Sequence, residues 1–314
     1  GAVVAMVMLL PSIVSILLLR FLERYNIRYD RISDADLRPN RGRDTAWGLS
    51  GTVLSVGMLS IFAVIFVVPL VQNWPYQTQF TLAHVQAVFA DSELQTVYLH
   101  SLGMALCTAF FGTLLAYGAA LITARSTLPK WRKQSVDSIA LVTNTIPGMV
   151  LGLAFLFTFT GTPLQNTFPL MILCNIVHYF STPYLMMKNS LSKMNAGWET
   201  TAMLMGDSWP KTILRVVTPN AASSLIEVFS YYFINAMVTI SALIFLAGAR
   251  TMVLTTKIKQ LQYVNEYNEV FVLSLLILFT NLLAKAIFTW LVNRSAQTGK
   301  RNNKKRKETK PSCI

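Results

Sequence analysis

The chain has 314 residues, of which 53% are hydrophobic and only 13% are charged, and its mean hydropathy is +0.47. A soluble domain usually carries about 25% charged residues, so this composition excludes an ordinary soluble protein and indicates a polytopic membrane protein. The three cysteines have neither a metal-ligand spacing nor a disulfide pattern, and the net charge of +13 has to be interpreted from where the charges lie.

Seven apolar runs are long enough to cross a membrane as helices, since a span needs roughly 20 mostly apolar residues. They cover about residues 2–19, 50–71, 97–124, 136–158, 167–187, 220–247 and 269–292. The predicted fold is therefore all-α, a membrane helical bundle with a six-span core and one extra amino-terminal span. A signal peptide over 2–19 is disfavoured, because the arginines follow the apolar run instead of preceding it.

Lysine and arginine residues divide the segments between the spans into two classes. The segments 20–49, 125–135, 188–219 and 293–314 carry 23 of these residues, whereas 72–96, 159–166 and 248–268 carry three. Basic loops stay in the cytosol, so the first class is expected inside, with the carboxyl terminus cytosolic. The basic tail then contacts lipid and is expected to be disordered; a nucleic-acid arm is disfavoured because it lacks aromatic side chains to stack on bases.

The chain is divided accordingly into four parts. These are an extra span at 1–20, an Arg-rich cytosolic linker at 21–49, the six-span core at 50–292 with a long cytosolic loop at 188–219, and a basic cytosolic tail at 293–314. The location expected for such a chain is a plasma membrane, crossed several times.

The cytosolic loop at 188–219 is much longer than a plain helix–helix connection, which is usually roughly 2–8 residues. Its first half has helix-forming residues up to Met205, and Gly206 is expected to end that helix. A helical hairpin on the cytosolic side of a membrane protein is suited to dock a soluble partner. The alternative is a plain connecting loop whose glycine and proline only terminate helices.

A second short helix is expected in the other half of the loop. Asp207 or Ser208 can cap it, and Pro210 is tolerated in its first turn. Thr218 and Pro219 repeat that pattern, with Thr218 as the cap and Pro219 as the first residue of the next span.

The first half of the loop resembles the cytoplasmic "EAA" loop of permease subunits of bacterial ABC importers, whose pattern is E-A-A, three residues, G, nine residues, I-x-L-P. With Gly206 aligned, Ala202 matches the second alanine and Thr201 replaces the first. Thr200 falls at the glutamate position, and the only carboxylate, Glu199, lies one residue early.

The second half of the loop also agrees with that pattern. Val216 stands for the isoleucine, Thr218 for the leucine, and Pro219 matches. The loop lies between the fourth and fifth core spans, as the resemblance requires, and "NTIPGMVLGLAF" (144–155) is similar to the Pro-Gly span of the same family. The resemblance covers roughly residues 50–292.

The resemblance implies several partner chains. In the family this loop sits in a groove of a dimer of ABC ATPase subunits, and closure of that dimer on ATP displaces the loop and rocks the spans. The implied partners are the ATPase dimer, a second permease half or homologous permease, an extracytoplasmic solute-binding protein and membrane lipid, with no nucleic acid. Glu199 would offer a charged anchor to the ATPase, and Gly206, with Asp207 beside it, would let the backbone approach closely.

The chain itself is expected to be no enzyme and to bind no cofactor, with ATP used by the partner subunit. It contains no G-x-x-x-x-G-K-[ST] sequence, and in "GDSWPKT" Pro210 stands where the second glycine must be. The implied cargo is a small hydrophilic solute such as ferric iron, a phosphonate or a polyamine. The alternative is an ion-coupled secondary transporter, which would need midplane charges and broken helices.

The start of the chain resembles part of a fused permease. Residues 1–20 are similar to the last span of a first permease half, and 21–49 to the linker, in fusions of the ferric-iron, 2-aminoethylphosphonate or polyamine-like type. The chain is therefore expected to be the second half of such a fusion. A seven-span permease is the alternative.

Polar groups inside membrane spans are functional candidates by default. Four of them could line a translocation path or form hydrogen bonds between packed helices: Asn144, Asn175, Asn235 and Ser241. Gly148 and Gly152 have the spacing typical of close helix packing.

Glu227 and Lys285 are predicted to form an ion pair inside the membrane. Each lies seven or eight residues from the cytosolic end of its span, roughly 10–12 Å deep, on consecutive antiparallel helices. Pairing would reduce the cost of burying either charge. The alternative is that Lys285 extends to the lipid headgroups while Glu227 faces water or is protonated.

Overall fold

The computed structural model describes residues 14, 18, 40–74 and 76–308. The predicted extra span at 1–20, apart from Val14 and Leu18, and most of the predicted linker lie outside these residues. The chain divides into two compact units. The larger takes in Thr96–Lys257 and Ile277–Ile314, and the smaller takes in Leu10–Gln95 and Ile258–Leu276.

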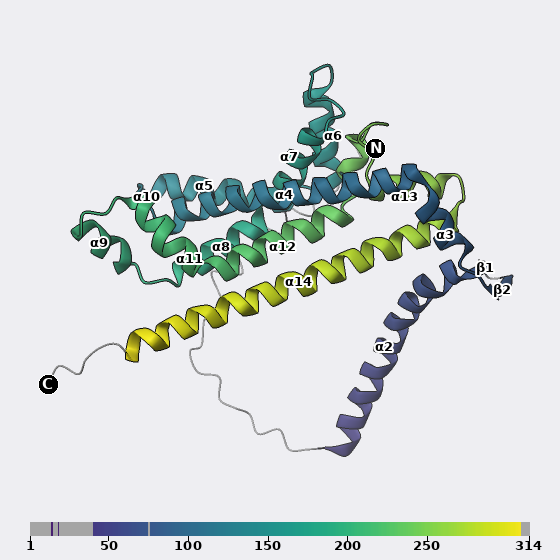
Figure 1. The fold of residues 1–314 in the computed structure, drawn as a ribbon, viewed down its shortest axis with the longest axis horizontal. Coiled ribbons are helices and arrows are strands. Elements are labelled where there is room, and N and C mark those ends of the chain that lie inside the picture. Colours follow the sequence, from purple (N-terminus) through teal and green to yellow (C-terminus); the bar gives the residue numbers. More distant parts are fainter. Residues whose placement is uncertain (1–13, 15–17, 19–39, 75, 309–314) are drawn as a thin grey trace. The chain divides into compact units, whose positions relative to one another are not determined.

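The described amino-terminal part of the smaller unit is one long apolar helix followed by a small hairpin (Figure 1). Helix α2 (Arg41–Val67) continues as a 3₁₀ turn (Val68–Leu70) into two short antiparallel strands, β1 (Val71–Asn73) and β2 (Gln77–Phe80), and then α3 (Ala83–Ala90). Helix α2 has no buried residue. Most of its apolar side chains are therefore exposed among the described residues.

Helix α2 begins earlier than the sequence predicts. The expected span starts at residue 50, but the Asn40 side chain accepts hydrogen bonds from the amides of Gly42 (3.1 Å) and Arg43 (3.3 Å). This cap satisfies amides that the first turn leaves without helical partners. Residues 41–49 of the predicted linker are consequently helical.

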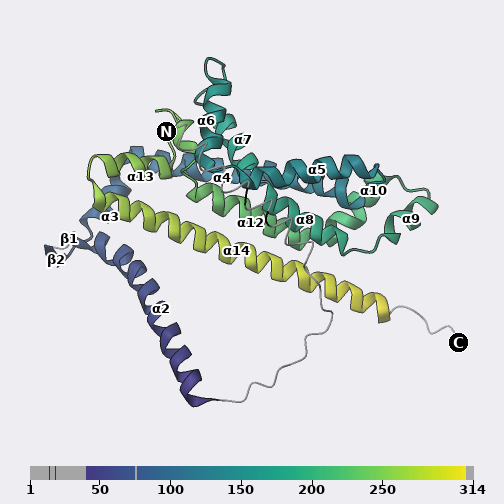
Figure 2. The same cartoon turned by 180° about the vertical axis from the view of Figure 1, so that it is seen from behind.

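From residue 92 on the described chain is built from helices, several of them broken, and residues 96–257 and 277–308 of it belong to the larger unit. In chain order they are α4 (Ser92–Arg125), α5 (Lys130–Val142), a 3₁₀ turn (Thr143–Thr145), α6 (Gly148–Phe159), α7 (Phe168–His178), α8 (Ser181–Ser192), α9 (Gly197–Leu204), α10 (Trp209–Thr212), a π-helix (Ile213–Val217), α11 (Thr218–Asn220), α12 (Ala222–Val238), a 3₁₀ turn (Leu243–Phe245), α13 (Leu254–Tyr263) and α14 (Tyr267–Glu308). Helices α8 and α12 run side by side, as both views show (Figure 1 and Figure 2).

Three described helices are long and apolar enough to cross a membrane unbroken, and two bent pairs add to them. The unbroken ones are Arg41–Leu70, Ser92–Arg125 and Tyr267–Arg294. The pair Phe168–His178 and Ser181–Ser192 bends by 57°, and the pair Trp209–Asn220 and Ala222–Val238 bends by 75°. The predicted spans at 50–71, 97–124 and 269–292 are thus continuous helices, whereas those at 136–158, 167–187 and 220–247 are interrupted.

The predicted span at 136–158 is not one helix. It splits into α5 and the shorter apolar α6, with the break at Ile146-Pro147. Proline has no amide hydrogen and disfavours helical backbone in the residue before it, and Ile146 is extended, with φ −89° and ψ 118°. Similarly, the predicted span at 220–247 is helical only to Val238, because Thr239 is extended.

The basic tail also differs from the prediction. Helix α14 continues through residues 293–308, where disorder was expected. The residues there are mostly helix formers such as alanine, glutamine, lysine and arginine, and no proline occurs before Pro311.

The two glycines of the predicted packing motif let α6 approach the segment after α12. A Cβ atom on Gly148 would come within 3.1 Å of His178 Cε1 and would overlap the Ser241 hydroxyl. A Cβ atom on Gly152 would overlap the carbonyl oxygen of Ala242 and come within 2.8 Å of its Cα. Both glycines therefore serve close packing in this fold.

Candidate functional site

The glycine of the loop ends α9 with a Schellman motif. Gly206 adopts φ +81°, a left-handed conformation that glycine tolerates best. Its amide donates to the Met203 carbonyl (3.0 Å), and the Asp207 amide donates to the Ala202 carbonyl (2.9 Å). These are the two hydrogen bonds of the motif, and they satisfy carbonyls at the end of the helix. Gly206 thus reverses the chain as the sequence predicts.

Helix α10 begins after Ser208, with Pro210 in its first turn, close to the prediction. The Ser208 side chain makes no capping hydrogen bond. Asp207 does not cap the helix either, because its carboxylate pairs with Lys211 four residues later.

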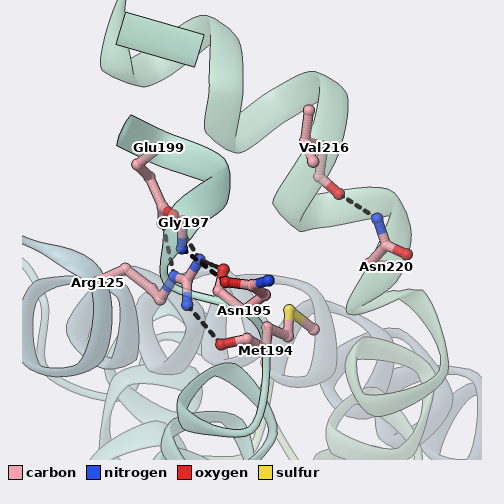
Figure 3. Close-up of polar contacts among 7 residues, drawn as sticks. All are labelled: Arg125, Met194, Asn195, Gly197, Glu199, Val216 and Asn220. Carbon is pink, nitrogen blue, oxygen red and sulfur yellow. Dashed lines mark hydrogen bonds and ion pairs between the residues drawn. The ribbon is translucent and has the colours of Figure 1, made fainter. Parts of the chain in front are cut away.

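The prediction that Thr218 caps a new helix is wrong. Residues 209–220 are helical throughout, and the π-helix at Ile213–Val217 leads directly into α11. The Thr218 hydroxyl donates to the Ile213 carbonyl (2.9 Å), and the Asn220 side chain donates to the Val216 carbonyl (2.7 Å, Figure 3). These bonds satisfy carbonyls in a stretch where Pro219 has no amide to offer. The sharp bend comes later, at Ala221.

Glu199 is bound within the chain. The guanidinium of Arg125, the last residue of α4, contacts both oxygens of the Glu199 carboxylate, from Nε to Oε1 (2.6 Å) and from Nη2 to Oε2 (2.5 Å). It also donates to the carbonyls of Met194 (3.0 Å) and Asn195 (2.9 Å) (Figure 3). The side chains are only 4% and 17% exposed, so this is a nearly buried, bidentate ion pair.

The end of α9 presents three large apolar side chains outward. Met203, Leu204 and Met205 are 72%, 84% and 79% exposed. We call these three residues the apolar tip. Thr200 and Thr201, at the first two positions of the E-A-A pattern, are exposed beside it, while Ala202 is half-buried. The tip is an apolar patch on a polar segment, the kind of feature that marks an interaction site.

The predicted path residues fall into different environments. Asn175 is fully buried, with its Nδ2 atom 3.9 Å from Met104 Sδ. Ser241 lies against Gly148, and Asn144 lies in the 3₁₀ turn before α6. Asn235 lines a described cavity, and its Nδ2 donates to the Tyr231 carbonyl (2.7 Å).

That cavity lies in the larger unit between α8, α12 and α14 and has a volume of about 620 Å³. Glu227, Tyr231, Asn235 and Lys285 are among the residues that line it. Glu227 and Lys285 are both exposed, and neither has an ion-pair partner within 4.0 Å among the described residues. The predicted Glu227–Lys285 ion pair is therefore not formed in this structure. The two charges line the same cavity.

We expect neutralisation of these two charges to have additive effects. Glu227→Gln and Lys285→Gln should each shift the apparent Tm of the purified protein by no more than about 2 °C, since neither group loses a bonded partner. The double variant should show the sum of the two shifts. The Arg125→Gln and Glu199→Gln cycle provides a positive control, because that contact pair should be clearly non-additive. A non-additive Glu227/Lys285 cycle of similar size would contradict the geometry.

Residues 112–297 match the family of binding-protein-dependent transport system inner membrane components. The chain belongs to this family. The two bends and the long loop at 188–219 are thus features of a transport-system membrane component, and the family does not favour an ion-coupled secondary transporter.

Two curated relatives support this assignment. A ferric transport system permease protein FbpB 1 of Haemophilus influenzae is 26% identical over 263 residues, which are 78% of this chain and 40% of that protein. A ferric transport system permease protein FbpB of Actinobacillus pleuropneumoniae is 22% identical over 243 residues, which are 74% of this chain and 34% of that protein. The chain therefore spans well under half the length of these relatives.

Solved structures of ABC transporters share the fold of this chain. A bacterial ABC transporter that imports alginate superposes with a TM-score of 0.62 at 13% identity, over 82% of this chain and 98% of that chain. The MetNI methionine ABC transporter gives a TM-score of 0.53 at 18% identity, over 65% of this chain and 99% of that chain. The predicted all-α ABC importer permease fold is confirmed.

Sequence reasoning missed Arg125 and the apolar tip. Arg125 lies 74 positions before Glu199, and its place at the end of a predicted span gives no sign of that partner. The tip was detectable, because three consecutive apolar residues directly before Gly206 are unusual in a loop expected to face the cytosol.

Proposed function

We propose that this chain is a permease subunit of an ATP-driven ABC importer in a bacterial plasma membrane. A separate dimer of ATPase subunits hydrolyses ATP, and an extracytoplasmic binding protein delivers the solute. The observation that carries the proposal is the loop of residues 193–212, in which a Schellman turn at Gly206 presents the apolar tip. A second permease half or homologous permease completes the pathway.

The apolar tip is the proposed contact with the ATPase subunit. Three exposed apolar side chains in one turn give a compact surface that a groove on another protein can bury. Burial of a Met or Leu side chain stabilises a contact by about 1.5–3 kcal/mol before the cost of association. Glu199 does not offer a free charge to the partner, since Arg125 already binds it.

The proposed cargo is a small hydrophilic solute, with ferric iron as the first candidate. Both curated relatives are named as ferric transport permeases. The cavity with Glu227, Asn235 and Lys285 supplies a polar lining beside α12, and we propose it as one wall of the translocation path. Asn144, Asn175 and Ser241, considered from the sequence for the path, are better suited to helix packing or to the break before α6.

The orientation follows from the basic residues. With the loop and α14's basic end in the cytosol, the loop faces the compartment where ATP is hydrolysed. The segment 72–96, which carries no lysine or arginine, is then expected on the opposite side, where a binding protein would deliver the solute.

Co-expression with the ATPase subunit of the same importer tests this function. The detergent-solubilised chain should retain the ATPase subunit, and Leu204→Asp should lower the retained amount at least 10-fold, because a carboxylate in an apolar groove is costly to bury. Trp131→Asp is the matched control, since Trp131 is also exposed but lies outside the loop at the start of α5. Transport by the chain without any ATPase subunit would contradict the proposal.

A further inference from the structure

The coupling loop, which we define as residues 193–218, is attached to α4 at both of its ends. At the first end Arg125 binds Glu199 and the carbonyls of Met194 and Asn195. At the second end the hydroxyl of Tyr117 lies 2.7 Å from that of Thr218. Arg125 and Tyr117 are eight residues apart on one helix, about 12 Å along its axis.

The Arg125 contact is a firm attachment. It uses Nε, Nη1 and Nη2 of one planar group, and the resulting bonds fix both the position and the angle of the start of α9. Helix α9 has no fully buried residue, and of its large side chains Trp198 packs partly against the core. Side-chain packing therefore holds α9 weakly, and the hydrogen bonds of Arg125 carry most of its attachment.

The part of the loop between the two attachments is largely free of the spans. Most of residues 200–211 are exposed, and the ion pair of Asp207 with Lys211 lies within the loop. Beyond this part, Thr212, Ile213 and Val217 are buried. A displacement imposed on the apolar tip thus reaches the membrane part through the Arg125 contact at one end and through this packed segment and Thr218 at the other. Coupling between distant sites is carried by such hydrogen-bond networks and rigid elements.

We infer that α4 is the helix that receives the movement of the coupling loop, and that Arg125 is the positioning residue that transmits it through Glu199. This inference rests on the proposed function, because it requires an ATPase subunit that moves the tip. Arg125 touches neither solute nor nucleotide. Its role is to make α9 and α4 move as one body, and the Tyr117–Thr218 hydrogen bond is a second link to α4 beside the packed residues Ile213 and Val217.

The test uses the assembled importer in proteoliposomes with its ATPase subunits and its solute-loaded binding protein. Three quantities are measured: the ATPase subunit retained per permease, the rise in ATP hydrolysis on adding the loaded binding protein, and solute uptake. Arg125→Gln should keep at least half of the retained ATPase subunit but lower the rise in hydrolysis and the uptake at least 5-fold. Tyr117→Phe should lower the rise in hydrolysis and the uptake about 2-fold each.

Two further variants distinguish loss of the Arg125–Glu199 contact from a nonspecific defect of the protein. Arg132→Gln is the matched control. Arg132 is exposed in α5, and its guanidinium lies 5.1 Å from the ring centroid of Trp131. The rise in ATP hydrolysis and the uptake should be unchanged in this variant. The exchanged pair Arg125→Glu with Glu199→Arg restores the ion pair but not the hydrogen bonds to the carbonyls of Met194 and Asn195, so it should recover only part of the lost uptake, at least 2-fold.

The outcomes distinguish this inference from the proposed function. If the unchanged chain retains no ATPase subunit, the proposed function fails. If the unchanged chain retains the ATPase subunit, and Arg125→Gln keeps a normal rise in ATP hydrolysis and normal uptake, the inference is overturned. Loss of the ATPase subunit from a folded Arg125→Gln variant also overturns it, because the residue would then act in docking. If Arg125→Gln does not accumulate, Arg125→Lys decides, since it keeps the charge without the bidentate contact: at least 2-fold uncoupling supports the inference, and normal coupling overturns it.

Discussion

Replacement of Gly206 by leucine is expected to lower both ATPase-subunit retention and solute uptake at least 10-fold, while the chain still inserts into the membrane. The structure places Gly206 at φ +81°, where a side-chain-bearing residue costs roughly 1–2 kcal/mol. No atom lies within 4 Å of a Cβ added there, so the cost comes from the backbone and not from crowding within the chain. Relaxing that strain breaks the two Schellman hydrogen bonds and displaces the apolar tip.

Gly206→Asn is the matched control for this prediction. Asparagine tolerates the left-handed conformation far better than leucine, so the turn and most of the retention should survive. Retention is measured by co-purification from detergent and uptake in proteoliposomes. If Leu and Asn variants are equally defective, the partner touches position 206 directly and the backbone explanation is wrong. If both are normal, the turn has no part in coupling.

Gly152→Leu is expected to prevent accumulation of folded protein, and Gly152→Ala to lower the apparent Tm by roughly 3–10 °C. A Cβ atom at this position would overlap the carbonyl oxygen of Ala242. The obstacle is backbone and cannot rotate away as a side chain can. Overpacking of this kind typically costs 1–3 kcal/mol, which corresponds to several degrees in a domain of this size.

The control for this second prediction is Gly118→Ala in α4. No atom lies within 4 Å of a Cβ added at Gly118, and alanine is about 0.5–1 kcal/mol better than glycine within a helix. The Gly118→Ala variant should be as stable as the parent or slightly more stable. Fluorescence-detected size-exclusion chromatography after heating gives the apparent Tm of the Gly152→Ala and Gly118→Ala variants. A Gly152→Ala variant as stable as Gly118→Ala would contradict the packing of α6 against Ala242.

The sequence was sufficient for the class of fold and for the turn at Gly206. Hydrophobic runs locate membrane helices because lipid requires internal backbone hydrogen bonding, and the charge difference between loops assigns their sides. The break at Pro147 was visible in principle, since proline removes a hydrogen bond from any helix that contains it. The 57° bend near Tyr179 has a similar signal, because Pro183 has no amide hydrogen to donate to the carbonyl four residues earlier, but its angle depends on how α7 and α8 pack in the larger unit.

The candidate site was less accessible to sequence reasoning. Counting residues placed Glu227 and Lys285 at similar depth, but the direction in which each side chain leaves its helix, and the distance between helices, depend on tertiary packing. The two groups consequently share a cavity without pairing. The same limit hid the partner of Glu199, because hydropathy and spacing carry no information about a contact 74 positions away.

The π-helix at Ile213–Val217 has a consequence for how relatives of this chain can be aligned. A π-turn contains one residue more than the α-turn it replaces, and here the side chains of Thr218 and Asn220 accommodate the extra residue. Loss of a single residue within 213–217 would convert the turn to regular α-helix and leave the tip and α12 in place. The same deletion in α10 would rotate the later helical residues by about 100° about the helix axis. Relatives of this chain can therefore have one residue fewer between the positions of Gly206 and Pro219, provided that the deletion falls in the π-turn.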